Sequence, residues 1–143
     1  MRDEPSYSPP PQGNYVPARR HGDLIFTSGM TPRQDGVLLH AGKVSMNVPI
    51  ETYGAAVELA TQNCIFAAEA QLTPNERLST VLNLIVYVNA DQQITLHSRL
   101  ADFASGMIDR RFGGVPSRAA IGVSSLPGDA TVEVSMVAAA AQQ

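Results

Sequence analysis

The sequence predicts an α+β protein, a mixed β-sheet with two helices packed on one face. Two segments, 49–71 and 95–111, repeat apolar residues at spacings of three and four, as an amphipathic helix does. Several other segments alternate apolar and polar residues or are rich in β-branched residues, which is typical of strands. The chain has 143 residues, 44% hydrophobic and 16% charged, and this length suits one compact domain of two packed layers.

The first residues differ in composition from the rest. Residues 1–13 hold four of the ten prolines, with Ser and Gln between them, and contain too little apolar surface to fold alone. We expect a flexible Pro-rich tail over 1–13 and a single domain over 14–143.

The first half of the domain predicts a hairpin followed by a helix. A strand starting in Tyr15–Ala18 precedes a polar turn at Arg19–Asp23 and a buried strand at Leu24–Gly29. A loop over 30–44 holds a short strand around Val37–Leu39. The first helix runs from Pro49, which suits a first helical turn, to about Gln71.

The second half predicts a central strand, the second helix and a closing hairpin. Ser79–Val88 is almost wholly apolar in its second half, as expected of a strand covered by helices. A helix over 95–111 follows, with Asp102 predicted on its outer face. The runs 118–123 and 131–137 flank a Leu-Pro-Gly-Asp turn and therefore predict a hairpin.

Composition excludes several classes of function. A net charge of −3 and thinly spread Lys and Arg make nucleic acid an improbable partner. The only cysteine, Cys64, cannot form an internal disulfide and is predicted in the core. No apolar leader and no run of about 18 apolar residues is present, so we expect a cytoplasmic protein without membrane contact. His21, His40 and His97 lie in different elements, which makes a metal site improbable.

Two charged residues of the closing segment are candidate functional groups. Arg118 begins one strand and Glu133 lies inside the other, each among small or apolar neighbours. An arginine can hold a carboxylate bidentately and a glutamate can polarise a water, which fits a small anionic ligand. An ion pair at the edge of a twisted hairpin explains the same two residues equally well.

A sheet with helices on one face leaves its other face apolar and uncovered. Such a surface is normally buried against another subunit, so we expect a homo-oligomer.

Several motifs resemble the Rid family, the imine and enamine deaminases also called the YjgF family. They are G-x-Y at 13–15, G-D-L-I-F-T-S-G at 22–29, V-Y-V at 86–88, and P-S-R-A-A-I-G-V-S-S-L-P-G-D-A-T-V-E-V at 116–134. The resemblance covers nearly the whole chain beyond residue 12, and the fifteen-residue separation of Arg118 and Glu133 is its most specific part. It implies a chorismate-mutase-like homotrimer with clefts between subunits, acting without a cofactor.

The resemblance also implies roles for individual residues. Arg118 matches the arginine that grips the substrate carboxylate, and Glu133 the glutamate that positions the attacking water. Tyr15 and Ser28 match residues that line the cleft. The implied reaction is hydrolysis of a 2-imino or enamine acid to a 2-oxo acid and ammonia.

Two positions depart from the best-known deaminases of the family. Ala120 replaces a cysteine, and His97 is the nearest match to a cleft asparagine, either contacting a larger substrate or lying exposed on its helix. The segment R-A-A-I-G-V-S-S-L-P-G-D-A-T-V-E-V resembles the subgroup called chorismate-mutase-like by its fold. The implied role is either housekeeping or, given the two departures, action on a pathway-specific intermediate.

Two alternatives use the same residues. A carboxylate-binding module would need no turnover. An isomerase or lyase of a chorismate-like dicarboxylate would need a second cation, for which Arg19, Arg20 and His97 are the candidates. A ribonuclease, an activity ascribed to some members, has little support in an acidic chain without paired histidines.

Overall fold

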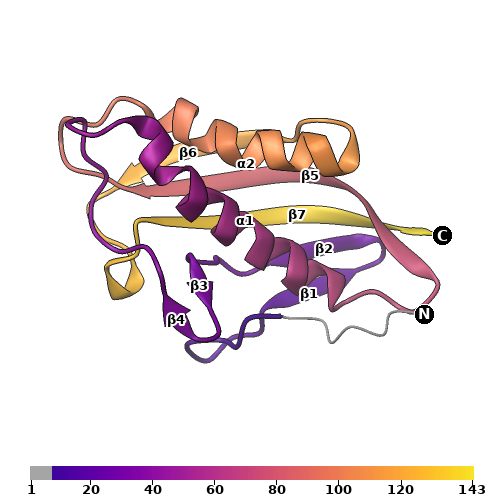
Figure 1. The fold of residues 1–143 in the computed structure, drawn as a ribbon. Coiled ribbons are helices and arrows are strands. Elements are labelled where there is room, and N and C mark those ends of the chain that lie inside the picture. Colours follow the sequence, from indigo (N-terminus) through magenta and orange to yellow (C-terminus); the bar gives the residue numbers. More distant parts are fainter. Residues whose placement is uncertain (1–7) are drawn as a thin grey trace.

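The computed structural model describes residues 8–143 and contains one main sheet, a small two-stranded sheet and two α-helices (Figure 1). In chain order the elements are β1 Ala18–His21, β2 Leu24–Thr27, β3 Arg33–Gln34, β4 Val37–Leu38, the 3-10 helix η1 Ile50–Tyr53, α1 Gly54–Glu69, β5 Glu76–Asn89, α2 His97–Phe112, β6 Ser117–Val123, the 3-10 turn η2 Pro127–Asp129 and β7 Val132–Gln142.

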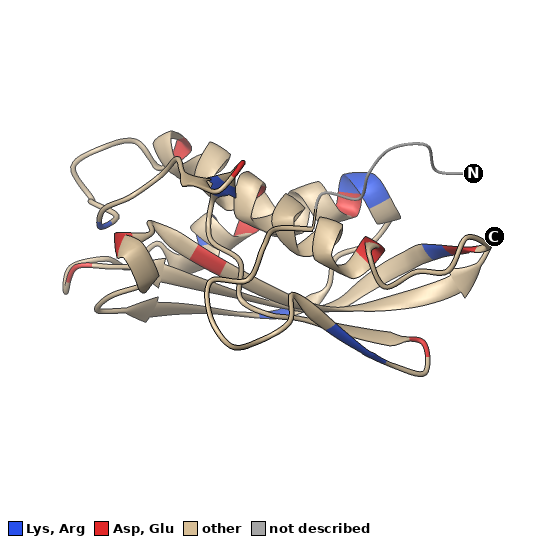
Figure 2. Ribbon diagram, turned by 90° about the horizontal axis from the view of Figure 1, so that it is seen from below, with Lys and Arg blue, Asp and Glu red and all other residues tan. Residues whose placement is uncertain are grey.

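The main sheet has five strands in the order β1-β2-β7-β5-β6, with β5 and β6 parallel and all other neighbours antiparallel. Both helices lie on the same side of this sheet, as the edge-on view in Figure 2 shows. The predicted α+β class, a mixed sheet with two helices on one face, is confirmed.

The predicted closing hairpin is wrong, because β5 lies between β6 and β7. The unit β5-α2-β6 is a crossover connection, and such a unit makes its two strands parallel. Because β6 occupies one side of β5, β7 can pair only with the other side, which it does over most of its length. The loop over 124–131 therefore passes the end of β5 and is not a two-strand turn.

The helices begin and end close to the predicted bounds. The turn after Pro49 is the 3-10 helix η1, and α1 proper begins at Gly54, which packs against the ring of Phe103 on α2. Helix α2 starts at His97, two residues later than predicted, and ends at Phe112. Gly113 follows with φ 75°, the left-handed conformation that commonly ends a helix.

The first hairpin is displaced along the chain from its predicted position. Arg19, Arg20 and His21 were predicted in a turn but belong to β1, and the turn itself is Gly22–Asp23, where Gly22 has φ 60°. Arg20 makes a bidentate pair with Glu76 at the start of β5, with both N–O distances 2.6 Å. This pair joins the hairpin to the central strand, so Arg20 has a structural role.

The two faces of the sheet differ in what covers them. Leu84, Val86 and Val88 of β5 and Val132 and Val134 of β7 are fully buried on the face toward the helices. We call the opposite side the open face. By strand register it carries Phe26, Val137 and Asn83 in one row, Ser135, Ile85 and Ala119 in the next, and Glu133, Tyr87 and Ile121 in a third. Phe26 is 46% exposed and Ile121 41%. The predicted uncovered apolar face is present in the chain.

Residues 8–13 form neither helix nor strand and lie before β1. The remainder of the predicted Pro-rich tail, residues 1–7, lies outside the described residues. Among residues 8–143, no helix is long and apolar enough to cross a membrane.

Candidate active site

Arg118 lies on β6 at the edge of the sheet and points toward the helices. It is paired in register with Leu84, a fully buried residue of the helix-facing side. Its Nη1 donates to Ser105 Oγ at 2.8 Å and forms an ion pair with Asp102 Oδ1 at 2.8 Å. Its Nη2 donates to the carbonyl and the hydroxyl of Ser98, at 3.0 and 2.8 Å. Arg118 is therefore fixed against α2 by three residues of that helix.

Ala120 and His97 belong to the same region. Arg118, Ala120 and Gly122 alternate along β6 and face the helices, because their partners on β5 are Leu84, Val86 and Val88. His97, the first residue of α2, covers Gly122 so closely that a Cβ added there would lie 2.5 Å from its Nε2. His97 is half-buried, so it is not the fully exposed helix residue that the sequence left open. The three predicted residues Arg118, Ala120 and His97 thus share one side of β6.

Glu133 lies on the open face, where its carboxyl group covers the backbone of Gly29. A Cβ added at Gly29 would lie 2.7 Å from Glu133 Cδ, a contact that only a glycine allows without movement. The carboxylate has no hydrogen bond or ion pair to any of residues 8–143. Burial raises the pKa of Glu133 above its usual range, because the charged form loses hydration that no partner replaces. Such a carboxylate is suited to accepting and returning a proton.

Tyr15 and Ser28 meet at one pocket at the end of the first hairpin. The hydroxyl of Ser28 donates to the carbonyl of Val16 at 2.6 Å, which holds the segment carrying Tyr15 against β2. The pocket is lined by Tyr15, Val16, Arg19, Phe26, Thr27 and Ser28. Gly29, whose backbone the Glu133 carboxyl group covers, follows Ser28 directly in the chain. Arg19 also lines this pocket and adds a positive charge to it.

The predicted site residues therefore form two groups within one chain. Arg118, Ala120 and His97 lie on the helix side of β6, whereas Tyr15, Ser28 and Glu133 lie toward the open face or the end of the first hairpin. Glu133 is level with Ile121, two strands across and three residues along from Arg118, which places the two Cα atoms about 14 Å apart. The edge ion pair between Arg118 and Glu133 is excluded. Arg118 forms its ion pair with Asp102 instead, although the sequence predicted Asp102 on the outer face of its helix.

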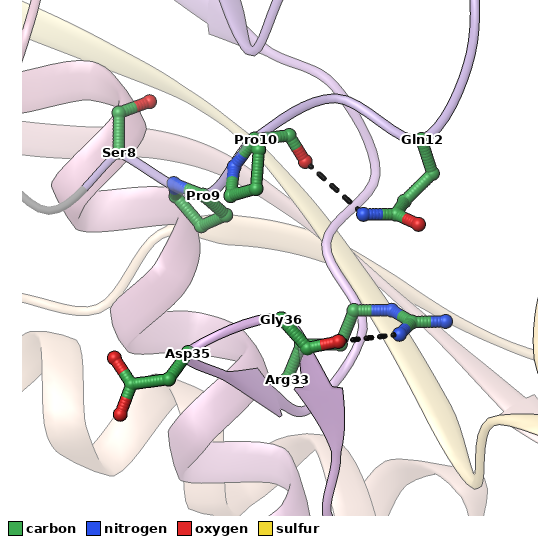
Figure 3. Close-up of a pocket in the computed structure, with 7 residues that line it drawn as sticks. All are labelled: Ser8, Pro9, Pro10, Gln12, Arg33, Asp35 and Gly36. Atoms are coloured by element: carbon green, nitrogen blue, oxygen red, sulfur yellow. Dashed lines mark hydrogen bonds between the residues drawn. The ribbon is translucent and has the colours of Figure 1, made fainter.

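A buried cysteine and one further pocket contribute none of the predicted catalytic groups. Cys64 is fully buried, its thiol donates to the carbonyl of Val134, and burial raises its pKa to about 12, so the predicted core position is correct. A further pocket between residues 8–12 and the β3–β4 turn contains none of the predicted site residues (Figure 3). In residues 8–143, no three His, Cys, Asp or Glu side chains cluster in a way that could hold a metal ion.

Comparison with known proteins identifies the family. The profile described as Endoribonuclease L-PSP matches residues 6–140, nearly the whole chain. The chain belongs to this family. It is the Rid or YjgF family, so the resemblance carried by the sequence motifs is confirmed. Its members are typically cofactor-free deaminases of imines and enamines.

Three relatives illustrate the range of the similarity. Protein TCP17 of Trypanosoma cruzi is 31% identical over 127 residues, which are 87% of this chain and 79% of that protein. The structure of Atu1372 of Agrobacterium tumefaciens, a protein of unknown function, has a TM-score of 0.78 at 28% identity and covers 88% of this chain and 81% of its own. Escherichia coli TdcF with bound serine has a TM-score of 0.68 at 20% identity, over 95% of each chain, a likeness of fold alone.

Proposed function

We propose that this Rid-family chain hydrolyses 2-imino or enamine acids to 2-oxo acids and ammonia. The observation that carries the proposal is Glu133, a half-buried carboxylate with a raised pKa and no partner among residues 8–143. A carboxylate kept in that state costs stability, and such groups cluster at functional sites. Family membership favours this reaction over others that use a lone carboxylate.

The reaction needs a placed water, a group that transfers protons and a group that holds the substrate carboxylate. The C=N carbon of a 2-imino acid is already electrophilic, so a water need only be placed beside it. Glu133 accepts a proton from that water as the water oxygen bonds to the carbon. It then returns the proton to the substrate nitrogen. The hydroxyl proton of the resulting amino alcohol then moves to the nitrogen through the same carboxylate, the C–N bond breaks, and ammonia leaves the 2-oxo acid behind. Arg118 holds the substrate carboxylate throughout, because a guanidinium forms a charge-assisted hydrogen bond with a carboxylate.

The position of the two groups favours a site shared between copies of the chain. Arg118 and Glu133 lie on opposite faces of one sheet and about 14 Å apart, too far to contact one small substrate. Arg118 stands at the sheet edge, and the apolar open face beside Glu133 is suited to covering by a neighbouring subunit. We therefore propose a homotrimer, the usual assembly of the family, with Arg118 of one copy facing Glu133 of the next.

Turnover tests the reaction directly. 2-Iminopropionate is generated from alanine by an amino-acid oxidase, and its disappearance is followed by semicarbazide trapping. The wild type should accelerate the loss, Arg118→Ala should abolish the acceleration, and Glu133→Gln should lower kcat more than it changes substrate binding. No acceleration by the wild type would reject this substrate class.

Subunit mixing tests the shared site. Arg118→Ala and Glu133→Gln chains are mixed in equal amounts, unfolded together and refolded. In a randomly mixed ring, about a quarter of the sites combine the intact Arg118 of one copy with the intact Glu133 of the next, so about a quarter of the wild-type rate should return. A site within one chain predicts no recovery.

One observation favours a second candidate, an isomerase or lyase acting on a dicarboxylate. Arg19 lines the pocket of Tyr15 and Ser28 and could hold a second carboxylate there. Arg20, another candidate for this role, is engaged by Glu76. Binding of a dicarboxylate that Arg19→Ala weakens, without imine hydrolysis by the wild type, would favour this reading.

A further inference from the structure

Asp102 is paired with the guanidinium to which the proposed function assigns the substrate carboxylate. Its Oδ1 lies 2.8 Å from Arg118 Nη1, the distance of a charge-assisted hydrogen bond. A carboxylate on a guanidinium is the same chemical contact that the proposed reaction requires between substrate and Arg118. The chain therefore supplies its own carboxylate to the group that must bind one.

The partners of Arg118 differ in how easily they can leave. Ser98, Asp102 and Ser105 stand at spacings of four and three on α2, so all three lie along one side of the helix. Ser105 is buried and the Ser98 carbonyl belongs to the first turn of the helix, so neither can move without disturbing α2. The Asp102 side chain is 66% exposed and can rotate into water, where its charge is hydrated.

We propose that Asp102 sets the affinity of the site by competing with the substrate carboxylate for Arg118. The two serines hold the guanidinium in place, and Asp102 leaves when the substrate arrives. Since each substrate must displace this carboxylate, Asp102 raises the concentration at which small carboxylates bind. It selects against weak carboxylate ligands that offer no contact beyond the arginine. This inference rests on the proposed role of Arg118.

A positioning role for Asp102 would give the opposite change in carboxylate affinity. If Asp102 only positioned Arg118, its loss would leave the guanidinium less ordered and weaken carboxylate binding. If it competes, its loss should strengthen binding while the serines keep the arginine in place. The sign of the change therefore separates the two roles.

The test uses Asp102→Asn, which keeps the shape and removes the charge. Asp109→Asn is the matched control, because Asp109 is an exposed acid of the same helix and its replacement changes the net charge equally. Pyruvate, the 2-oxo acid product expected from 2-iminopropionate, is titrated into each full-length protein by NMR, and KM and kcat for 2-iminopropionate are measured in parallel. Arg118→Ala reports the binding that depends on the arginine.

Competition predicts that Asp102→Asn lowers the Kd of pyruvate and the KM by about two- to fivefold, the range that a partly exposed ion pair gives, with kcat nearly unchanged. The gain should shrink at high salt, which screens the same ion pair. Asp109→Asn should leave Kd within its error.

A weaker Kd in Asp102→Asn, an unchanged Kd, or an equal gain in Asp109→Asn would each overturn the inference. The proposed function fails separately, if no variant consumes 2-iminopropionate. Tighter pyruvate binding in Asp102→Asn would then still establish the competition.

Discussion

Gly29→Ala should disable Glu133 without unfolding the protein. The new methyl group would lie 2.7 Å from Glu133 Cδ, 3.1 Å from its Cγ and 3.0 Å from its Oε2. An ordinary contact between carbon atoms is about 3.5 Å, so the carboxyl group must move by about 0.8 Å or more. It can do so, because the atoms that clash belong to the end of a side chain and not to backbone.

The substitution should reduce the reaction rate much more than the folding stability. Displacing a reacting group by about 1 Å can cost about 100-fold in rate, equivalent to about 2.7 kcal/mol of transition-state stabilisation. Pushing Glu133 off its preferred rotamer costs only about 0.5–1.5 kcal/mol of folding stability. The variant should therefore fold and lose most of its activity.

The assay compares kcat/KM for 2-iminopropionate with thermal unfolding in the wild type, Gly29→Ala and Gly114→Ala. Gly114 is the matched control, because a Cβ added there meets nothing within 4 Å. Activity of Gly29→Ala within a fewfold of the wild type would refute the role of Glu133 and of its close contact with Gly29. A large loss of unfolding temperature would instead show that Gly29 is structural.

Three further predictions test the charge states and the open face. Because Glu133 must be ionised to accept a proton and burial raises its pKa, kcat/KM should fall with decreasing pH at a midpoint above the usual pKa of a glutamate, and Glu133→Gln should remove this limb of the pH profile. Glu76 has a pKa lowered to about 2 by its arginine partner, so its contribution to stability is present above about pH 4.5 and is lost as the pH falls toward 2. Glu76→Gln should therefore lower the unfolding temperature near pH 6 and approach the wild type at low pH, whereas the exposed Glu58→Gln should change it little at either pH, as calorimetry can check. Ile121→Lys on the open face should give a smaller species by light scattering and abolish turnover, whereas Val37→Lys, at a residue 57% exposed on β4, should change neither.

Local pattern predicted which residues share a face, but not which strands are neighbours. The alternation of residues 118–123 and 132–136 is correct at every position, because side-chain direction in a strand depends only on the strand itself. The pairing of these two strands with each other was wrong, because β5 competes for both of them. A 14-residue strand with a largely apolar second half gains more by pairing on both of its sides, and the crossover through α2 fixes β6 beside it.

The contacts of the candidate site needed the fold. Nothing in the sequence near Gly29 or Glu133 indicates that they touch, since 104 positions separate them. The sequence placed Asp102 on the outer face of its helix and assigned nothing to Ser98 and Ser105, which form a polar row with it at spacings of four and three. The row has a role because Arg118, on the edge strand β6, donates to it. Only the packing of α2 on β6 brings the arginine and the row together.

In the proposed homotrimer, a single chain offers both groups but does not form the complete site. Burying Arg118 under α2 beside Asp102 satisfies its charge, and leaving Glu133 half-buried on the open face raises its pKa. Under the two proposals, a substrate and a second subunit would change these states together. The substrate would replace Asp102 on Arg118, and the neighbour would cover the face that carries Glu133. Activity in such a protein should depend on assembly as strongly as on either residue. A loss of turnover on dilution, reversed by concentration, is the behaviour that this arrangement requires if its subunits dissociate.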